Sequence, residues 1–213
     1  MGKPAPCLNS MYLGTLMSIV VRPVNSVDES ASAFRYANST FGSIGGGVRD
    51  EAYYTGRFAS EGDLQIICVE DATIMGITLG SLEGAGVLIG ECAVDESLQG
   101  QGYGRLMLQE LEEAAKRRGL TSIHLGAVDS AVEFYVRCGF ETVLMVQTQQ
   151  DGDLLSRVLA GPLNSTPGVT HRNHPQWGYQ AFAKLPAPDF ALQAEIQAMG
   201  AHCGFAMTKE LVA

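Results

Sequence analysis

The sequence predicts a mixed α/β domain, and three observations support this fold class. Apolar residues make up 46% of the 213-residue chain and charged residues 17%, which is enough apolar material for a core. Several short β-like runs follow one another, and strand-like and helix-like patterns then alternate, as expected of an α/β domain. No proline occurs from residue 24 to residue 161, so this stretch can hold uninterrupted helices and strand ladders.

The first half of the chain predicts mainly strands. The run at 18–23 is apolar and predicts the first strand, and residues 26–38 carry a weakly helical pattern that the glycines of 41–47 interrupt. A tight turn is expected near Asp71, because apolar runs lie on both sides of it. The strands expected here lie at 63–71, 72–81 and 84–94.

The second half predicts helices between strands. Apolar residues recur at helical spacing from Met107 to Ala115, basic residues follow at the negative end of this helix, and Gly119 ends it. Asp189 is expected to cap a helix that carries Leu192, Ile196 and Met199 on one face and ends at Gly200. The other expected elements are a strand at 120–128, a short helix at 130–140 ended by Gly139, a strand at 141–149, a loop-like stretch at 150–188 and a last strand at 204–211.

The stretch LQGQGYGRLM, residues 98–107, places three glycines at the expected start of a helix. A helix N-terminus exposes backbone N–H groups, and Gly100, Gly102 and Gly104 carry no Cβ atoms that would keep an anion away from them. The spacing fits neither a P-loop, which needs Lys followed by Ser or Thr, nor the dinucleotide fingerprint, which needs glycine at Arg105. The pattern therefore predicts a phosphate-binding helix start of another kind.

The pattern Q-x-x-G-x-G at Gln99, Gly102 and Gly104 resembles the GNAT superfamily of acetyl-CoA-dependent N-acetyltransferases. A second stretch, AVEFYVRCGFE at 131–141, resembles the other signature of that family, A-x-x-x-Y-x-x-x-G-F, and lies one strand downstream as the family requires. The resemblance covers residues 18–147 and the last strand. It implies a GNAT-like, mostly antiparallel central sheet flanked by helices.

The resemblance also implies acetyl-CoA as the cosubstrate. In the family, the glycine segment and a preceding Val-Asp pair wrap the pyrophosphate of coenzyme A, and the strand residue corresponding to Val94 binds the pantetheine arm and the acetyl carbonyl. The residues expected to bind the cofactor are Val94, Gln99, Gly100, Gln101, Gly102, Tyr103, Gly104 and Arg105.

The expected catalytic residues are Tyr135 and Glu91. Tyr135 aligns with the family tyrosine that protonates the departing thiolate, although an aromatic core residue would fit the same position. Glu91 lies on the strand that leads to Val94, where several relatives carry a carboxylate base; an exposed strand carboxylate is the alternative, and Glu83 is a weaker candidate. Cys92 could in principle act as a nucleophile that carries the acetyl group. Family members generally use direct transfer, however, and cysteine is often a small buried apolar residue, so this role is not expected.

Two departures from the family pattern stand out. Val128, followed by Asp129, replaces an asparagine that contacts the pantetheine arm in many relatives. The last two strands, usually joined by a short connection, are separated here by an insertion at about 148–202. We expect this insertion either to form a substrate lid or dimer element, with Trp177 and Tyr179 contacting substrate, or simply to pack over the sheet. Its two histidines lie three residues apart without cysteine or carboxylate nearby, so no metal site is expected.

Composition limits the expected partners. The net charge of −9 argues against nucleic acid and anionic membranes and tolerates cationic ligands such as amines. Five scattered cysteines and the absence of a signal peptide or a long apolar run predict a cytoplasmic protein. We expect a flexible leader at 1–17 and a single domain at 18–213. The expected function is N-acetylation of a small primary amine by direct attack; the alternatives are a non-catalytic acyl-CoA sensor and a protein or peptide N-acetyltransferase.

Overall fold

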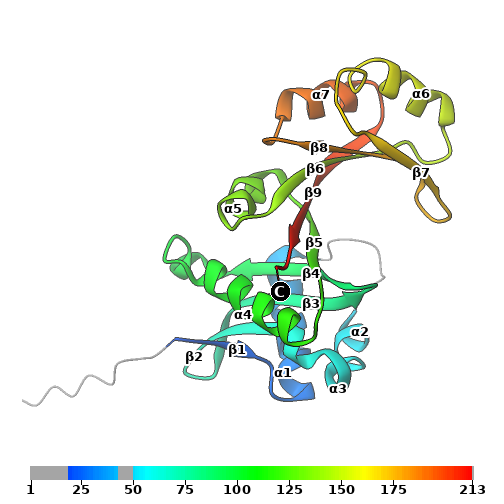
Figure 1. Cartoon of the computed structure of the whole chain (residues 1–213). Helices are drawn as coiled ribbons and strands as arrows, with labels where there is room; N and C mark the ends of the chain where they lie inside the picture. Colours follow the sequence, from blue (N-terminus) through cyan, green and yellow to red (C-terminus); the bar gives the residue numbers. More distant parts are fainter. Residues whose placement is uncertain (1–18, 43–49, 213) are drawn as a thin grey trace, which may run out of the picture.

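The computed structural model describes residues 19–42 and 50–212, which form one nine-stranded sheet with helices on both faces (Figure 1). The strand order is β1-β2-β3-β4-β5-β9-β6-β8-β7, and every neighbouring pair is antiparallel except β4 and β5. The predicted fold class, a mostly antiparallel mixed sheet with flanking helices, is confirmed. The expected leader and residues 43–47 of the glycine-rich break lie outside the described residues. Among the described helices, none is long and apolar enough to cross a bilayer.

The strands are β1 Val20–Pro23, β2 Gln65–Glu70, β3 Thr73–Glu83, β4 Gly86–Val94, β5 Ser122–Ala127, β6 Glu141–Gln147, β7 Thr170–His174, β8 Gly178–Leu185 and β9 His202–Glu210. The helices are α1 Val27–Phe41, α2 Glu51–Thr55, α3 Phe58–Glu61, α4 Tyr103–Arg117, α5 Val132–Arg137, α6 Gly152–Ala160 and α7 Phe190–Ala198. Short 3-10 turns lie at Gly62–Leu64 (η1), Glu96–Leu98 (η2) and Asp129–Ala131 (η3). The tight turn expected near Asp71 joins β2 to β3, with positive φ at Asp71 and Ala72 as two-residue hairpin turns require.

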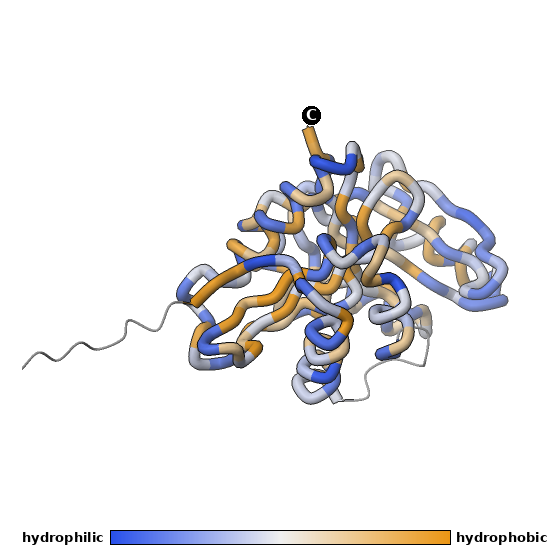
Figure 2. Tube along the Cα trace, turned by 90° about the horizontal axis from the view of Figure 1, so that it is seen from below, coloured by the Kyte–Doolittle hydropathy of each residue, from blue (hydrophilic) through white to orange (hydrophobic). Residues whose placement is uncertain are grey.

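Two apolar clusters cover the two faces of the first half of the sheet. The apolar face of α4 packs on one side, where Met107, Leu108 and Leu111 are almost fully buried against strand residues such as Ile66. On the other side, α1 and α2 pack on alternate residues of the same strands; this second cluster contains Ala33, Ala37, Tyr54, Ile67, Ile77 and Leu79. Figure 2 shows the hydrophobic segments concentrated in the strands, with hydrophilic segments at the outer turns.

A β-bulge in β4 reverses which side chains face α4. Leu79 of β3 pairs with Glu91, whereas the next residue, Gly80, pairs with Ile89, so Gly90 is the extra residue on β4. Before the bulge, Ile89 packs in the α4 cluster. After the bulge, Cys92 packs against the α4 cluster and Ala93 belongs to the α1 cluster. The bulge therefore decides that Glu91, which shares its face with Ala93, lies on the α1 and α2 side of the sheet.

The expectation of a loop-like stretch at 150–188 is wrong. This stretch contains α6, β7 and β8, and residues 180–185 of β8 pair with β6, so the insertion adds two strands to the sheet beyond β6. Asp151 caps α6 through a hydrogen bond from the Leu154 backbone N–H (2.7 Å). The apolar residues of α6, together with Ile196 of α7, cover one face of this added half, as Figure 1 shows at the top of the molecule.

Candidate active site

The parallel strands β4 and β5 separate partway along their length. Their pairing covers only Gly86–Leu88 with 122–124, although β4 continues to Val94 and β5 continues to Ala127. From that point β5 remains paired with β9 on its other side. A gap therefore opens between β4 and β5 towards their C-terminal ends.

Backbone groups of β4 point into this gap. The Asp95 N–H donates to the Met75 carbonyl (2.7 Å), which makes Met75 and Asp95 a hydrogen-bonded pair of β3 and β4. Hydrogen-bonded and non-hydrogen-bonded pairs alternate along an antiparallel ladder, so the N–H and C=O groups of Cys92 and Val94 point away from β3. These groups face β5, where the β4–β5 ladder has already ended.

The N-terminus of α4 lies directly after the end of β4. Gly102 is its N-cap residue, with φ of 92°, and within the described chain no side chain caps this helix and no acidic residue occupies its first turn. By contrast, α1, α6 and α7 each have a side-chain cap, from Ser26, Asp151 and Asp189. The first helical bond runs from the Leu106 N–H to the Gly102 carbonyl, so the amides of residues 102–105 form no helical hydrogen bond. An uncapped helix start of this kind suits an anion.

The three glycines of the segment have two different structural roles. Gly100 and Gly102 have φ of 75° and 92°, a conformation that side-chain-bearing residues rarely adopt, and a Cβ added to either would meet no atom within 4 Å. A Cβ on Gly104 would instead lie 3.1 Å from Cζ of Phe134. Gly104 therefore also allows α5 to approach the first turn of α4.

Side-chain hydrogen bonds hold the rest of the segment in place. The Gln99 amide Nε2 donates to the Val94 carbonyl (3.1 Å), and the Gln101 amide Nε2 donates to the Ser97 carbonyl (2.7 Å). Tyr103 is partly buried against the α4 cluster, and the Arg105 guanidinium donates to the Arg137 carbonyl (2.8 Å). The structure thus brings the residues expected to bind the cofactor together between the end of β4 and the first turn of α4.

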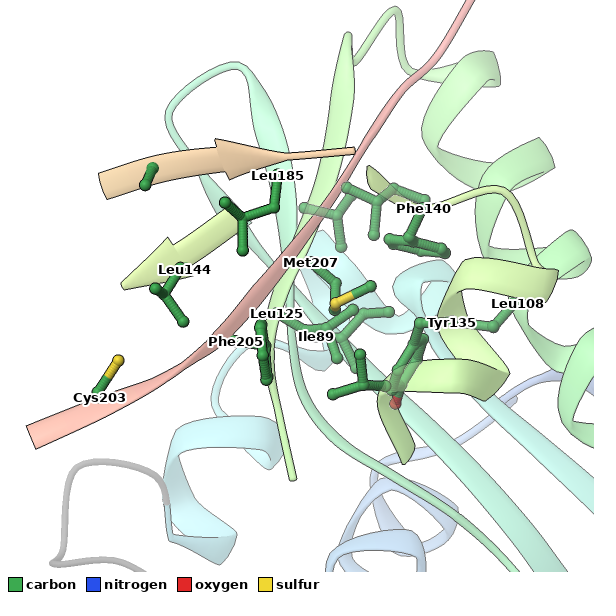
Figure 3. Packing of buried hydrophobic residues seen from close by; sticks show 14 of the residues in the cluster. Ile89, Leu108, Leu125, Tyr135, Phe140, Leu144, Leu185, Cys203, Phe205 and Met207 are labelled. Carbon is green, nitrogen blue, oxygen red and sulfur yellow. The ribbon is translucent and has the colours of Figure 1, made fainter. Parts of the chain in front are cut away.

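Tyr135 lies on α5 among buried apolar side chains and is only 5% exposed (Figure 3). Its ring makes edge contacts with Phe134 and Phe140, with centroids 5.1 Å and 5.6 Å away. Burial, and secondarily the nearby Cys92 thiol, raises the pKa of Tyr135 well above its ordinary value. Tyr135 is therefore a core residue whose hydroxyl, beside Cys92 of β4, stays protonated at neutral pH.

Cys92 is half-buried on the face of β4 that Tyr135 contacts. Its Sγ lies 3.4 Å from Oγ1 of Thr78, and burial raises the pKa of the thiol. A thiol that stays protonated is a poor nucleophile. Its environment gives no support to a covalent acetyl-cysteine.

Glu91 lies on the opposite face of β4 from Tyr135. The Tyr54 hydroxyl of α2, in a side chain that is 1% exposed, donates a hydrogen bond to Oε2 of Glu91. No feature of the sequence pointed to Tyr54, because the contact joins residues 37 positions apart in two different elements. Glu83, the weaker candidate, pairs with Gly86 at the other end of β4 from Val94, and its carboxylate is bonded to His124.

The departure at Val128 lies at the end of β5, where its side chain is 68% exposed. The next residue, Asp129, accepts a hydrogen bond from Nε2 of Gln193 (3.0 Å) on α7. Gln193 is buried and also donates to the Cys203 carbonyl (3.3 Å). Helix α7 of the insertion therefore holds the turn that connects β5 to the helix bearing Tyr135.

The structure does not bring Trp177 and Tyr179 close to Tyr135 and Glu91 along the sheet. Trp177 directly precedes β8 and Tyr179 lies at its start, and β8 is four strands from β4 in the strand order. Trp177 is 49% exposed in the β7–β8 turn, where its backbone N–H donates to Nδ1 of His174 (3.2 Å). Tyr179 packs against Gly152 at the start of α6. Among the described residues, no group of three or more His, Cys, Asp or Glu side chains could hold a metal ion.

Comparisons with known proteins agree with this architecture. Residues 33–140, about half of the chain, match the family model described as "Acetyltransferase (GNAT) family". The fold is similar to that of Ard1 from Thermoplasma volcanium, at 14% identity and a TM-score of 0.52, covering 92% of this chain and 99% of that one. The ribosomal-protein-S18-alanine N-acetyltransferase from Escherichia coli matches at 13% identity and a TM-score of 0.47, covering 92% and 96% of the two chains. No curated protein matches the chain. From its family match, the chain belongs to the GNAT family of acetyl-CoA-dependent acetyltransferases.

Proposed function

We propose that the protein transfers an acetyl group from acetyl-CoA to the primary amine of a small molecule by direct attack. The observation that carries this proposal is the gap between β4 and β5. The uncapped N-terminus of α4 lies at the end of this gap, and Tyr135 and Glu91 lie on the two faces of the strand that borders it. A thioester in the gap would be within reach of groups from both faces of the sheet.

The pyrophosphate of acetyl-CoA would bind the amides of residues 102–105, which the loop from Gln99 holds in place. The pantetheine arm would then run along β4 like an added strand. Its amides would pair with the backbone groups of Cys92 and Val94 that face the gap. The family resemblance assigns the pantetheine arm and the acetyl carbonyl to the backbone at Val94. Since the arm would pass Val94 before it reaches Cys92, the Cys92 N–H is the group that would stabilise an oxyanion at the thioester end.

Glu91 would act as the general base for the incoming amine. The ammonium loses a proton to the carboxylate, and the free amine nitrogen attacks the thioester carbonyl carbon. The Tyr54 hydroxyl holds one carboxylate oxygen, which orients the group from the α2 side. Tyr54 is thus a positioning residue for Glu91.

Tyr135 would act as the general acid for the leaving group. When the tetrahedral intermediate collapses, the carbon–sulfur bond breaks, the acetyl group stays on nitrogen, and the sulfur takes the Tyr135 hydroxyl proton. The hydroxyl carries its proton at neutral pH, and the burial that raises its pKa makes it a weaker acid in the free enzyme, so its proposed role rests on its place beside β4. As the amide forms, its nitrogen gives up a second proton, which goes to solvent. The proton that Glu91 accepted first returns through solvent to Tyr135, so each cycle yields the amide, the thiol and one released proton.

A small cationic amine fits the charge of the molecule best. The chain carries a net charge of −9, and the base is a carboxylate on the face of the sheet away from α4. Both features favour an amine that arrives protonated. The half-exposed Trp177 remains the residue of the insertion that we propose for contact with the acceptor, whereas Tyr179 is held under α6.

A panel of acceptors tests the proposal. Purified protein is incubated with acetyl-CoA and either small primary amines or short peptides with free N-termini and lysines, and the release of CoA thiol is measured. We expect turnover with at least one small amine and loss of that turnover in Tyr135→Phe. Turnover with peptides alone would assign the enzyme to protein acetylation and overturn the small-molecule proposal.

A further inference from the structure

We propose that a basic hollow between α4, α5 and β9 binds the 3′-phosphate of coenzyme A. The inference rests on the proposed function, because it requires coenzyme A to be the ligand. It gives a binding role to residues that the proposed function does not use for the pyrophosphate or the thioester. The hollow has a volume of about 100 Å³ and opens to solvent. Its lining residues are Arg105, Leu108, Gln109, Glu112, Arg137, Cys138 and Lys209.

The hollow carries more positive than negative charge. Three of its side chains are cationic and one is a carboxylate. Lys209 and Glu112 neutralise each other through a 2.6 Å ion pair. Among the described residues, the ion pairs found include neither Arg105 nor Arg137. The hollow therefore brings together two guanidinium groups that these ion pairs leave available for an anion.

Part of this cluster has a structural role that does not need Arg137. The Arg105 guanidinium donates to the Arg137 carbonyl (2.8 Å), and the Lys209 ammonium donates to the Cys138 carbonyl (2.9 Å), so both cap the C-terminal end of α5. Neither bond uses the Arg137 side chain, which belongs to an exposed residue. Arg105 also keeps further N–H donors after making one bond.

The position of the hollow matches the geometry of coenzyme A, whose pyrophosphate and 3′-phosphate are attached to the same ribose. The Arg105 backbone N–H is among the unpaired amides at the start of α4, and its side chain lines the hollow. Leu108, Gln109 and Glu112 follow at helical spacing on the same face of α4. Gly104 lets Phe134 pack on the first turn of α4, which brings α5 and Arg137 beside it. Two anion-binding places therefore lie side by side.

The test compares coenzyme A with 3′-dephospho-coenzyme A by isothermal titration calorimetry. We expect the wild-type protein to bind coenzyme A about tenfold more tightly, which corresponds to roughly 1.4 kcal/mol. In Arg137→Ala this preference should largely disappear while the affinity for the dephospho form is unchanged, and Arg137→Lys should keep part of it. The matched control is Arg117→Ala, because Arg117 lies at the other end of α4 and is exposed. The preference should also decrease as salt is added.

Three outcomes would overturn the inference. Equal affinity of the wild-type protein for the two ligands would show that the hollow does not bind the 3′-phosphate, and it would leave the proposed function intact. If Arg137→Ala lowers the affinity for both ligands by the same factor, Arg137 supports the fold and does not bind the phosphate. Failure of the wild-type protein to bind either ligand would overturn the proposed function together with the inference.

Discussion

Tyr135 is a buried core residue, and its proposed catalytic role depends on its hydroxyl alone. The ring fills space between Phe134 and Phe140, and the same burial keeps the phenol protonated by raising its pKa. The two interpretations of Tyr135 that the sequence left open are therefore compatible. A core role and a catalytic role are distinguished by whether removing the Tyr135 hydroxyl oxygen changes the rate of acetyl transfer.

Tyr135→Phe should lower kcat by about a hundredfold and leave the affinity for acetyl-CoA nearly unchanged, because in the proposed mechanism the hydroxyl acts only on the departing sulfur. Steady-state kinetics and direct binding measure the two effects. Tyr179→Phe is the control, since it removes the same hydroxyl from a partly buried tyrosine that packs against Gly152. A Tyr135→Phe enzyme with the wild-type rate, under conditions where chemistry limits turnover, would show that Tyr135 is a core residue only.

Glu91→Gln should lower the rate at neutral pH by about a hundredfold or more, since the amine then has no carboxylate to accept its proton. The rate of the variant should recover as pH rises, because the free amine becomes abundant in solution. A pH–rate profile of both enzymes measures this recovery. Glu83→Gln, at the far end of β4 and bonded to His124, should leave the profile unchanged. A profile of Glu91→Gln that is parallel to that of the wild type would exclude Glu91 as the base.

At the scale of elements, the start of α4 is the part of the fold that a ligand should stabilise. Acetyl-CoA at about one hundred times its dissociation constant should add roughly 2.7 kcal/mol to the free energy of unfolding, measured by thermal or denaturant unfolding. Gly102→Val should abolish this increment. Because φ at Gly102 is 92°, valine also strains the free protein, so the measured quantity is the difference with and without ligand. Protein purified free of CoA that shows no increment would contradict the assignment of the cofactor site.

The β7–β8 hairpin is the element whose role is least constrained by the fold. Trp177→Ala should raise the Michaelis constant for the acceptor and leave that for acetyl-CoA nearly unchanged. Because Trp177 is 49% exposed, the substitution should cost little stability, and the unfolding temperature serves as the control. Weakened acetyl-CoA binding with normal acceptor kinetics would refute a role of the hairpin in acceptor binding.

The elements that were predicted correctly are those whose own residues show a clear helix or strand pattern. Helix α4 shows its apolar spacing and its C-terminal basic residues, whereas β7 has no buried residue and forms a strand only because β8 pairs with it. In β8, buried Ala181, Ala183 and Leu185 alternate with other residues, but glycines and prolines on both sides favoured a loop. The bulge at Gly90 and the contact of Tyr54 with Glu91 depend on pairing between distant segments, and no local pattern encodes such contacts.

At the scale of the whole molecule, polar contacts connect the two halves of the sheet. Lys209 of β9 bonds to Glu112 of α4, and Gln193 of α7 bonds to Asp129 after β5. These contacts sit close to buried thiols. Burial, and secondarily Asp129, raises the pKa of Cys203 from the ordinary 9.0 to about 12, and the pKa values of Cys68, Cys92 and Cys138 are also raised.

These thiols should make the protein less stable at alkaline pH. Between pH 9 and about 12 the unfolded chain has lost the Cys203 proton while the folded protein keeps it, so stability present below pH 9 is lost as pH rises. For Cys203 alone the free energy of unfolding should fall by about 1.4 kcal/mol per pH unit in this window. Denaturant unfolding at several pH values measures the slope, and Cys203→Ala should make it shallower. An unchanged slope would show that the other thiols or tyrosines dominate.

Trp177 is the only tryptophan of the chain, and it lies in the β7–β8 turn, half exposed and four strands from β4. Indole fluorescence excited at the red edge of its absorption therefore reports on the insertion alone, without labelling. Circular dichroism reports on all helices and strands together. If the insertion opens before the rest of the domain, the two signals should melt at different temperatures. Coincident melting would show that the hairpin and the first half of the sheet unfold as one cooperative unit.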